Sequence, residues 1–173
     1  MTPPIQPILS NSCAKAATAG EARYRIDRPI AGRAARIVAL DEGAAEVVRR
    51  VAEQPWNDAR FFVFKAPVAA ADGTNGASAD LVLQATDGSE SRLSEELFDA
   101  DVAIVIATSD DGAEAASTIA KACDRQGIMA AGLILGERLE VGAAVSALRP
   151  YAPVLLVSDD EDDVSEVLTA LRA

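Results

Sequence analysis

The sequence contains no histidine, only two cysteines and few aromatic residues, which make up 4% of its 173 positions. Without histidine, the Ser-His and Cys-His pairs that activate nucleophiles cannot form, and the commonest general base is missing. Cys13 and Cys123 stand alone, so they make neither a disulfide framework nor a zinc site. Cys123 falls on the apolar side of a predicted helix, where we interpret it as a small buried hydrophobic residue.

The sequence also lacks long apolar runs and positive charge. No apolar run approaches the length of a membrane-spanning helix, and no basic segment followed by an apolar one begins the chain, so we expect a cytoplasmic protein. Lys and Arg number 16 against 27 Asp and Glu, which gives a net charge of −11. Such an acidic protein repels phosphates, so we expect neither a nucleic acid nor a membrane as a partner.

The charge is unevenly distributed along the chain. Residues 1–36 hold six basic and two acidic side chains, a net charge of +4, which leaves −15 for the rest. We predict a flexible basic N-terminal arm over 1–33 and a single domain over 34–173. The arm can fold back on the acidic body or bind a neighbouring acidic surface, and the alternation at 24–26 can add an edge strand.

From residue 34 onward, short apolar runs alternate with segments of helical periodicity. The predicted strands are 36–40, 60–64, 81–86, 101–108, 128–135 and 153–158. Four intervening segments place apolar residues at i, i+3, i+4 and i+7, the spacing of a helix with one buried face. Because strands that are apolar along their length are covered on both faces, we predict a Rossmann-like three-layer α/β sandwich with a mostly parallel six-stranded sheet.

Polar and acidic residues follow these strands, at the carboxyl ends where an open parallel sheet binds ligands. The candidate ligand-binding residues follow the first and fourth predicted strands: Asp41, Gly43, Ser109, Asp110, Asp111 and Gly112. None of them is assigned a catalytic role or a metal. Glu42 lies in the first of these turns as well, and similar residues at the other turns are Asp87, Gly88, Gly136, Glu137, Asp159, Asp160 and Glu161.

Carboxylates at these positions have three interpretations. They cap helix N-termini, each worth about 0.5–2 kcal/mol, or they bind Mg²⁺ as a cluster, or they have replaced the glycines of a phosphate site. No G-x-G-x-x-G turn follows the first strand, and no G-x-x-x-x-G-K-[ST] occurs. The fifth strand ends in Leu135-Gly-Glu-Arg without the lysine that a phosphorelay receiver domain needs there.

Four pieces of the sequence follow one another as in a known nucleotide-binding fold. They are Ile37-Val-Ala-Leu-Asp-Glu-Gly with its helix, Phe61-Phe-Val-Phe, the strand and helix on either side of Ser109, and Gly132-Leu-Ile-Leu-Gly with the helix and strand after it. In this order the chain resembles the nucleotide-binding half of the tubulin/FtsZ superfamily. The resemblance implies that GTP or GDP binds at the first glycine loop, the tubulin signature loop and the sugar-side loop.

The phosphate loops depart from the family pattern. FtsZ has GGGTGTG where this chain has Ser109-Asp-Asp-Gly-Ala-Glu-Ala, and the first loop keeps only Gly43. Asp110 and Asp111 would face the triphosphate, and each would repel it by about 3 kcal/mol at about 5 Å and an effective dielectric near 20. The chain ends at Ala173, without the part that supplies the family's catalytic carboxylates, so we expect neither GTP hydrolysis nor tubulin-type filaments.

These observations favour a domain with a degenerate nucleotide site that acts as a binding or protein-interaction module, with a protein partner or as a homo-oligomer. The alternative is a Mg²⁺-dependent nucleotide-binding enzyme that uses Asp41, Asp110, Asp111 and Asp159. No cofactor follows from the sequence, and GTP, GDP and Mg²⁺ stay open as ligands. In a third hypothesis, the basic arm docks on the acidic body of a neighbouring copy.

Overall fold

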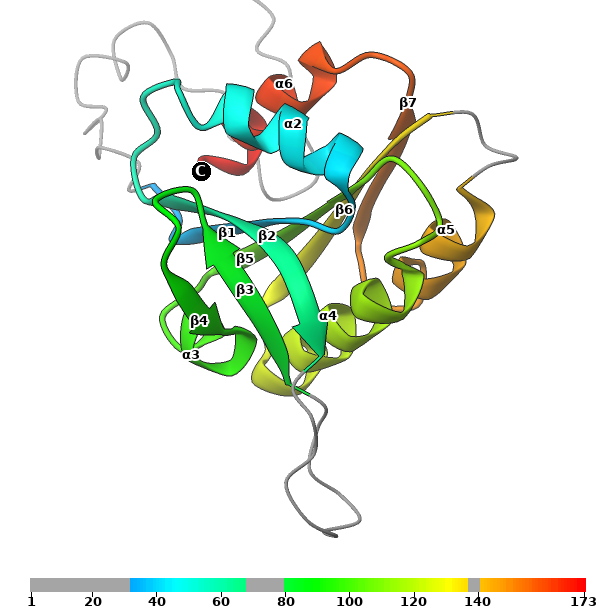
Figure 1. Cartoon of the computed structure of the whole chain (residues 1–173), viewed down its shortest axis with the longest axis horizontal. Coiled ribbons are helices and arrows are strands. Elements are labelled where there is room, and N and C mark those ends of the chain that lie inside the picture. The colour runs from blue at the N-terminus through cyan, green and yellow to red at the C-terminus, as the bar shows by residue number, and fades with distance from the viewer. Residues whose placement is uncertain (1–31, 68–79, 137–140) are drawn as a thin grey trace, which may run out of the picture. The chain divides into compact units, whose positions relative to one another are not determined.

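The computed structural model describes residues 32–67, 80–136 and 141–173, and these ranges contain seven strands and five helices (Figure 1). All of these elements belong to one unit, Ala31–Ala173. The predicted arm lies outside the described residues, apart from its last two, and so does the predicted edge strand at 24–26. In chain order the elements are β1 (Ala35–Ala39), α2 (Glu42–Val51), β2 (Ala59–Pro67), β3 (Leu81–Ala85), β4 (Glu90–Arg92), α3 (Leu93–Leu97), β5 (Val102–Ala107), α4 (Ala113–Gln126), β6 (Met129–Leu135), α5 (Gly142–Leu148), β7 (Val154–Ser158) and α6 (Asp162–Leu171).

The strands form one mostly parallel sheet in the order β4-β3-β2-β1-β5-β6-β7. Five neighbouring strands, from β2 to β7, run parallel, whereas β3 and β4 are antiparallel to their neighbours. The chain moves outward from β1 to β2 and later returns to the other side of β1 to form β5. The direction of strand addition therefore reverses between β1 and β5, which makes their carboxyl ends the topological switch point of the sheet.

Helices cover both faces of the sheet. Figure 1 shows α2 and α6 on one face and α4 and α5 on the other, and α3 packs on the α4 side. The strand β5 explains this layering, because all six residues of Val-Ala-Ile-Val-Ile-Ala are buried. Alternate side chains enter opposite layers: Ile104 packs toward α2 and α6, and Val105 packs toward α4 and α5. This α/β architecture agrees with the prediction and is consistent with a Rossmann-like fold.

The predicted strand number is wrong by one, because β4 adds a seventh strand. Its three residues, Glu-Ser-Arg, have no apolar run and pair antiparallel with β3 through a tight turn at Asp87 and Gly88. Gly88 supplies the positive φ, 88°, that the turn requires. A short polar edge strand gives almost no sequence signal, because its pairing comes from the turn and not from burial. Within the described ranges, no helix has the length and apolar character needed to cross a membrane.

Candidate functional site

The switch point brings two loops together that are far apart in the sequence. The loop after β1 carries Asp41, and the loop after β5 carries Thr108 and Ser109. Their strands are direct neighbours, with Ala39 opposite Ile106 in the parallel register. All six predicted ligand-binding residues lie in these two loops or the first turns of the helices that follow. The position predicted for the site is therefore one compact region of the structure.

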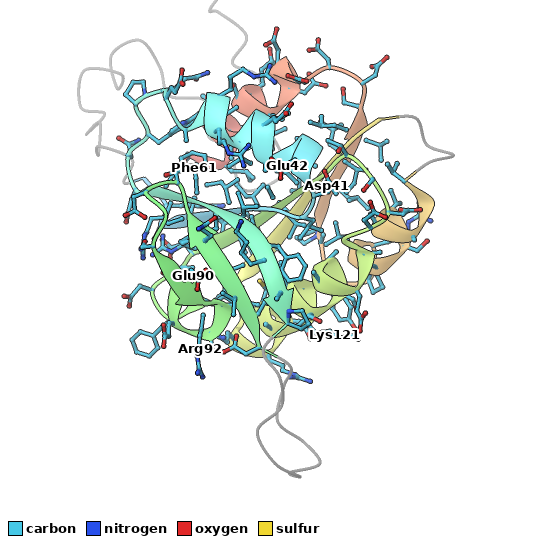
Figure 2. All side chains as sticks on the ribbon, in the orientation of Figure 1. Asp41, Glu42, Phe61, Glu90, Arg92 and Lys121 are labelled. Carbon is cyan, nitrogen blue, oxygen red and sulfur yellow. The ribbon has the colours of Figure 1, made fainter. Side chains whose placement is uncertain are left out.

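Asp41 uses both carboxylate oxygens to join the two loops. Its Oδ1 accepts hydrogen bonds from the Ala44 backbone N–H at 2.8 Å and from the Thr108 hydroxyl at 2.6 Å. Its Oδ2 accepts the backbone N–H groups of Thr108 at 2.8 Å and Ser109 at 3.1 Å. The Asp41 side chain, labelled in Figure 2, thus caps α2 and also binds the backbone of the opposite loop.

These four donors lie at the N-terminus of α2 and in the loop beside it. A helix N-terminus and the N–H groups of the adjacent loop together form the anion site of nucleotide-binding α/β folds. Here the anion is the protein's own carboxylate, and the partial positive charge at the start of α2 stabilises it. A nucleotide phosphate would have to displace Asp41 and then lie beside its negative charge. In this structure the Asp41 carboxylate therefore occupies the donors that face the switch point.

The two carboxylates of the β5–α4 loop serve neighbouring backbone and side-chain donors. Asp110 Oδ1 accepts the backbone N–H of Ala144, in the first turn of α5, at 2.8 Å. Asp111 accepts a hydrogen bond from the Ser109 hydroxyl at 3.2 Å. In the part of the chain that the structure describes, no group of three or more Asp, Glu, Cys or His side chains is arranged to hold a metal ion. This geometry favours the capping interpretation over a Mg²⁺ cluster.

The two glycines of the site, Gly43 and Gly112, are required by close packing. A Cβ atom on Gly43 would lie 2.3 Å from Thr108 Oγ1, the hydroxyl that binds Asp41. A Cβ atom on Gly112 would lie 2.4 Å from Leu40 Cβ. Both distances are too short for any real contact, so these glycines let the two loops approach each other. Their presence does not require a phosphate.

Replacing Gly43 with alanine is expected to lower the free energy of unfolding by about 1–3 kcal/mol, because the added methyl group displaces Thr108. Alanine is the better helix former, so propensity alone predicts a gain of about 1 kcal/mol instead. Gly142→Ala is the matched control, since a Cβ atom there meets nothing within 4 Å at the start of α5. Urea unfolding of both variants decides the question, and equal stability of the two would contradict the packing at Gly43.

The other predicted strand-end residues lie in separate turns. Hydrogen bonds from the Ser89 hydroxyl and backbone N–H hold the pKa of Asp87 below its usual value. Asp160 accepts the N–H of Asp162, and Glu161 pairs with Arg50 at 2.5 Å. Glu137 lies outside the described residues. The structure therefore brings together the predicted residues after the first and fourth strands, with Gly136 beside them, since a Cβ atom there would lie 3.6 Å from the Thr108 carbonyl oxygen.

Two features were missing from the predicted residues. The first is Thr108, whose only sequence signal is a hydroxyl residue at the end of an apolar run. The second is a buried ionic cluster beneath α3, in which Glu96 lies 3.6 Å from Arg36 and 2.5 Å from Arg60. The sequence gives no sign of the partners of Glu96, which lie on β1 and β2.

A separate pocket of about 470 Å³ lies away from the switch point, where β2 begins and β3 ends. Trp56 and Phe61 line it with their ring centroids 6.4 Å apart, and the Trp56 indole N–H donates to the Val51 carbonyl at 2.8 Å.

Cys123 is fully buried on α4, as predicted, and burial raises the pKa of its thiol to about 12. Burial and this raised pKa both disfavour the reactive thiolate.

No protein-family model matches the chain, and no curated protein matches it. The resemblance to the tubulin/FtsZ superfamily consequently stays a hypothesis drawn from the order of elements and the loop sequences.

Proposed function

We propose that this protein is an FtsZ-like or Rossmann-like domain whose nucleotide site is degenerate, and that it acts as a protein-interaction module and not as an enzyme. One observation carries the proposal. The Asp41 carboxylate occupies the N–H groups of Ala44, Thr108 and Ser109 at the switch point, where a phosphate would otherwise bind.

Electrostatics supports the same conclusion. A phosphate that approached Asp41 to within about 5 Å would meet a repulsion of about 3 kcal/mol at an effective dielectric near 20. Asp110 and Asp111 lie in the neighbouring loop and add to this repulsion. Displacing Asp41 would also cost the hydrogen bonds that join the two loops. Mg²⁺ binding to Asp41 is also disfavoured, because both carboxylate oxygens already accept hydrogen bonds from N–H and O–H donors.

Thermal unfolding in the presence of nucleotides tests the proposal. With GTP, GDP, ATP or NAD at millimolar concentration and Mg²⁺ present, we expect the unfolding temperature to stay within about 1 °C of the ligand-free value, because a ligand must bind the folded state to stabilise it. A shift of several degrees at micromolar nucleotide would overturn the degenerate site. The interaction role would then lose its main support.

A further inference from the structure

The strand β7 forms one edge of the sheet, and within the described ranges no strand pairs with its outer side. Its five residues, Val-Leu-Leu-Val-Ser, carry no charge, and all five are half-buried. The opposite edge, β4, has only three residues, two of which are the charged Glu90 and Arg92. Proteins protect sheet edges from pairing by short length, charge, proline or bulges. β4 has two of these features, and β7 has none inside the strand.

The contact between β7 and β6 determines which backbone N–H and C=O groups of β7 point away from the sheet. The Ser158 carbonyl accepts a hydrogen bond from the Gly136 N–H at 2.8 Å, so Ser158 faces β6. Because the backbone groups of successive residues in a strand point to opposite sides, Leu156 also faces β6, whereas Leu155 and Val157 face outward. The outer edge therefore offers two N–H and two C=O groups to a partner strand.

We propose that β7 pairs antiparallel with β7 of a second copy of this chain, about a two-fold axis at Leu156. In this register Leu155 lies opposite Val157 of the second copy, and the two residues exchange both backbone hydrogen bonds. The symmetry repeats the exchange, so four bonds form and every outward backbone group of Leu155 and Val157 is used. Leu156 then meets its own equivalent at the axis, and the two sheets become one continuous sheet.

The side chains on both faces of β7 suit this pairing. Leu155 and Val157 lie toward α5, beside a groove of about 380 Å³ that Val145 and Arg149 also line. Leu156 lies toward α6. Pairing brings the same apolar residues of the second copy alongside, so both faces continue across the axis without a charged residue in the strands. Directly opposed apolar side chains stabilise an antiparallel pair.

Charge complementarity favours a second copy as the occupant. The antiparallel register places the start of one β7 beside the end of the other. Arg149, which is exposed five residues before β7, then approaches Asp159 and Asp160, which are exposed just after the partner β7. The symmetry forms this contact twice, so an acidic protein with a net charge of −11 gains attraction at both ends of the interface.

This inference names the partner of the interaction module and so rests on the proposed function, but its geometry is independent of Asp41. A five-residue strand pair is a small interface, so the dimer should be weak and concentration-dependent. In sedimentation equilibrium over about 1 µM to 1 mM full-length protein, we expect the mass to rise from 18.0 kDa toward twice that value.

Val157→Pro removes one outward N–H, and an edge strand tolerates proline where the N–H faces solvent. We expect it to stay monomeric across the series while its circular dichroism spectrum matches wild type. Val157→Thr keeps the N–H and a similar shape, and we expect it to dimerise like wild type. Arg149→Glu places like charges at both ends, so we expect its dissociation constant to rise at least about tenfold at low salt.

Amide hydrogen exchange locates the interface. We expect the Leu155 and Val157 amides to become protected as the concentration rises, while the Leu156 amide is protected throughout by β6. A monomeric wild type at the highest concentration would overturn the inference and leave the nucleotide test untouched. Equal dimerisation by Val157→Pro would also overturn it, because another surface would then hold the dimer. Protection of Leu155 and Val157 at every concentration would mean that the same chain covers this edge, and would overturn it too.

Discussion

Asp41→Asn is expected to destabilise the protein almost as much as Asp41→Ala, by about 2–4 kcal/mol in the free energy of unfolding. The reason is the number of donors around this side chain. An aspartate accepts on both oxygens, and both are used, by Ala44 and Thr108 on one side and by Thr108 and Ser109 on the other. An asparagine keeps only one acceptor and turns its NH₂ group toward the two backbone donors.

A simple helix cap behaves differently. Asparagine and aspartate are equally good at the N-cap position, so a residue that only caps α2 would lose almost nothing on this change. Asp110 provides the matched control, because among the residues that the structure describes one of its oxygens accepts a backbone N–H, that of Ala144. We expect Asp110→Asn to cost less than about 1 kcal/mol. Urea unfolding of the three variants measures the difference, and a wild-type stability for Asp41→Asn would show that the contact between loops is not important.

Glu96→Ala is expected to lower the free energy of unfolding by about 3–5 kcal/mol, because it leaves a buried arginine without its counter-ion. The Arg36 and Glu96 side chains are only 7% and 6% exposed. Arg36 Nε also donates to the Glu96 carbonyl at 3.1 Å, which fixes the guanidinium beneath α3. Removing the carboxylate keeps the buried charge and takes away the group that neutralises it.

The two arginines around Glu96 should not contribute equally. Arg60 is 52% exposed and lies over the Phe62 ring at 5.3 Å, so water can solvate it when its partner is lost. We expect Arg60→Met to cost about 1 kcal/mol or less, because the Arg60 side chain is half exposed and Glu96 keeps Arg36 as its partner. The double change Arg36→Met with Glu96→Leu should recover most of the loss, because an apolar pair of similar volume replaces a buried ion pair well. Failure of this rescue would mean that the hydrogen bonds around Arg36 matter more than its charge.

The sequence predicts those strands and helices whose side chains are buried in the core. Continuous apolar runs such as Val102–Ala107 identify central strands, and the regular spacing in Glu42–Val51 identifies a helix with one buried face. Glu90–Arg92 could not be found this way, because its strand pairing depends on a turn and on β3. Hydrophobic pattern predicts what is buried, and an edge strand of three polar residues is not.

The sequence could predict that the candidate residues lie close together, but not which hydrogen bonds they make. Open parallel sheets bind ligands at the carboxyl ends of their strands, which points to Asp41 and Ser109, and the structure brings the loops that carry them together. The bonds from Thr108 and Ser109 to Asp41 span 67 and 68 residues of sequence, and no local spacing reveals such contacts. The sequence therefore left three interpretations for these carboxylates, and only the structure shows that Asp41 accepts hydrogen bonds from both loops.

The backbone amides of Thr108 and Ser109 provide the most direct test of this account. Their nitrogen-15 NMR resonances can be followed while Mg²⁺ with GTP, or inorganic phosphate alone, is titrated into the full-length protein to about 1 mM. Because both N–H groups already donate to Asp41, we predict that neither resonance moves. Saturable shifts of these two amides would show that a phosphate replaces the Asp41 carboxylate, and would contradict the proposal of a degenerate site.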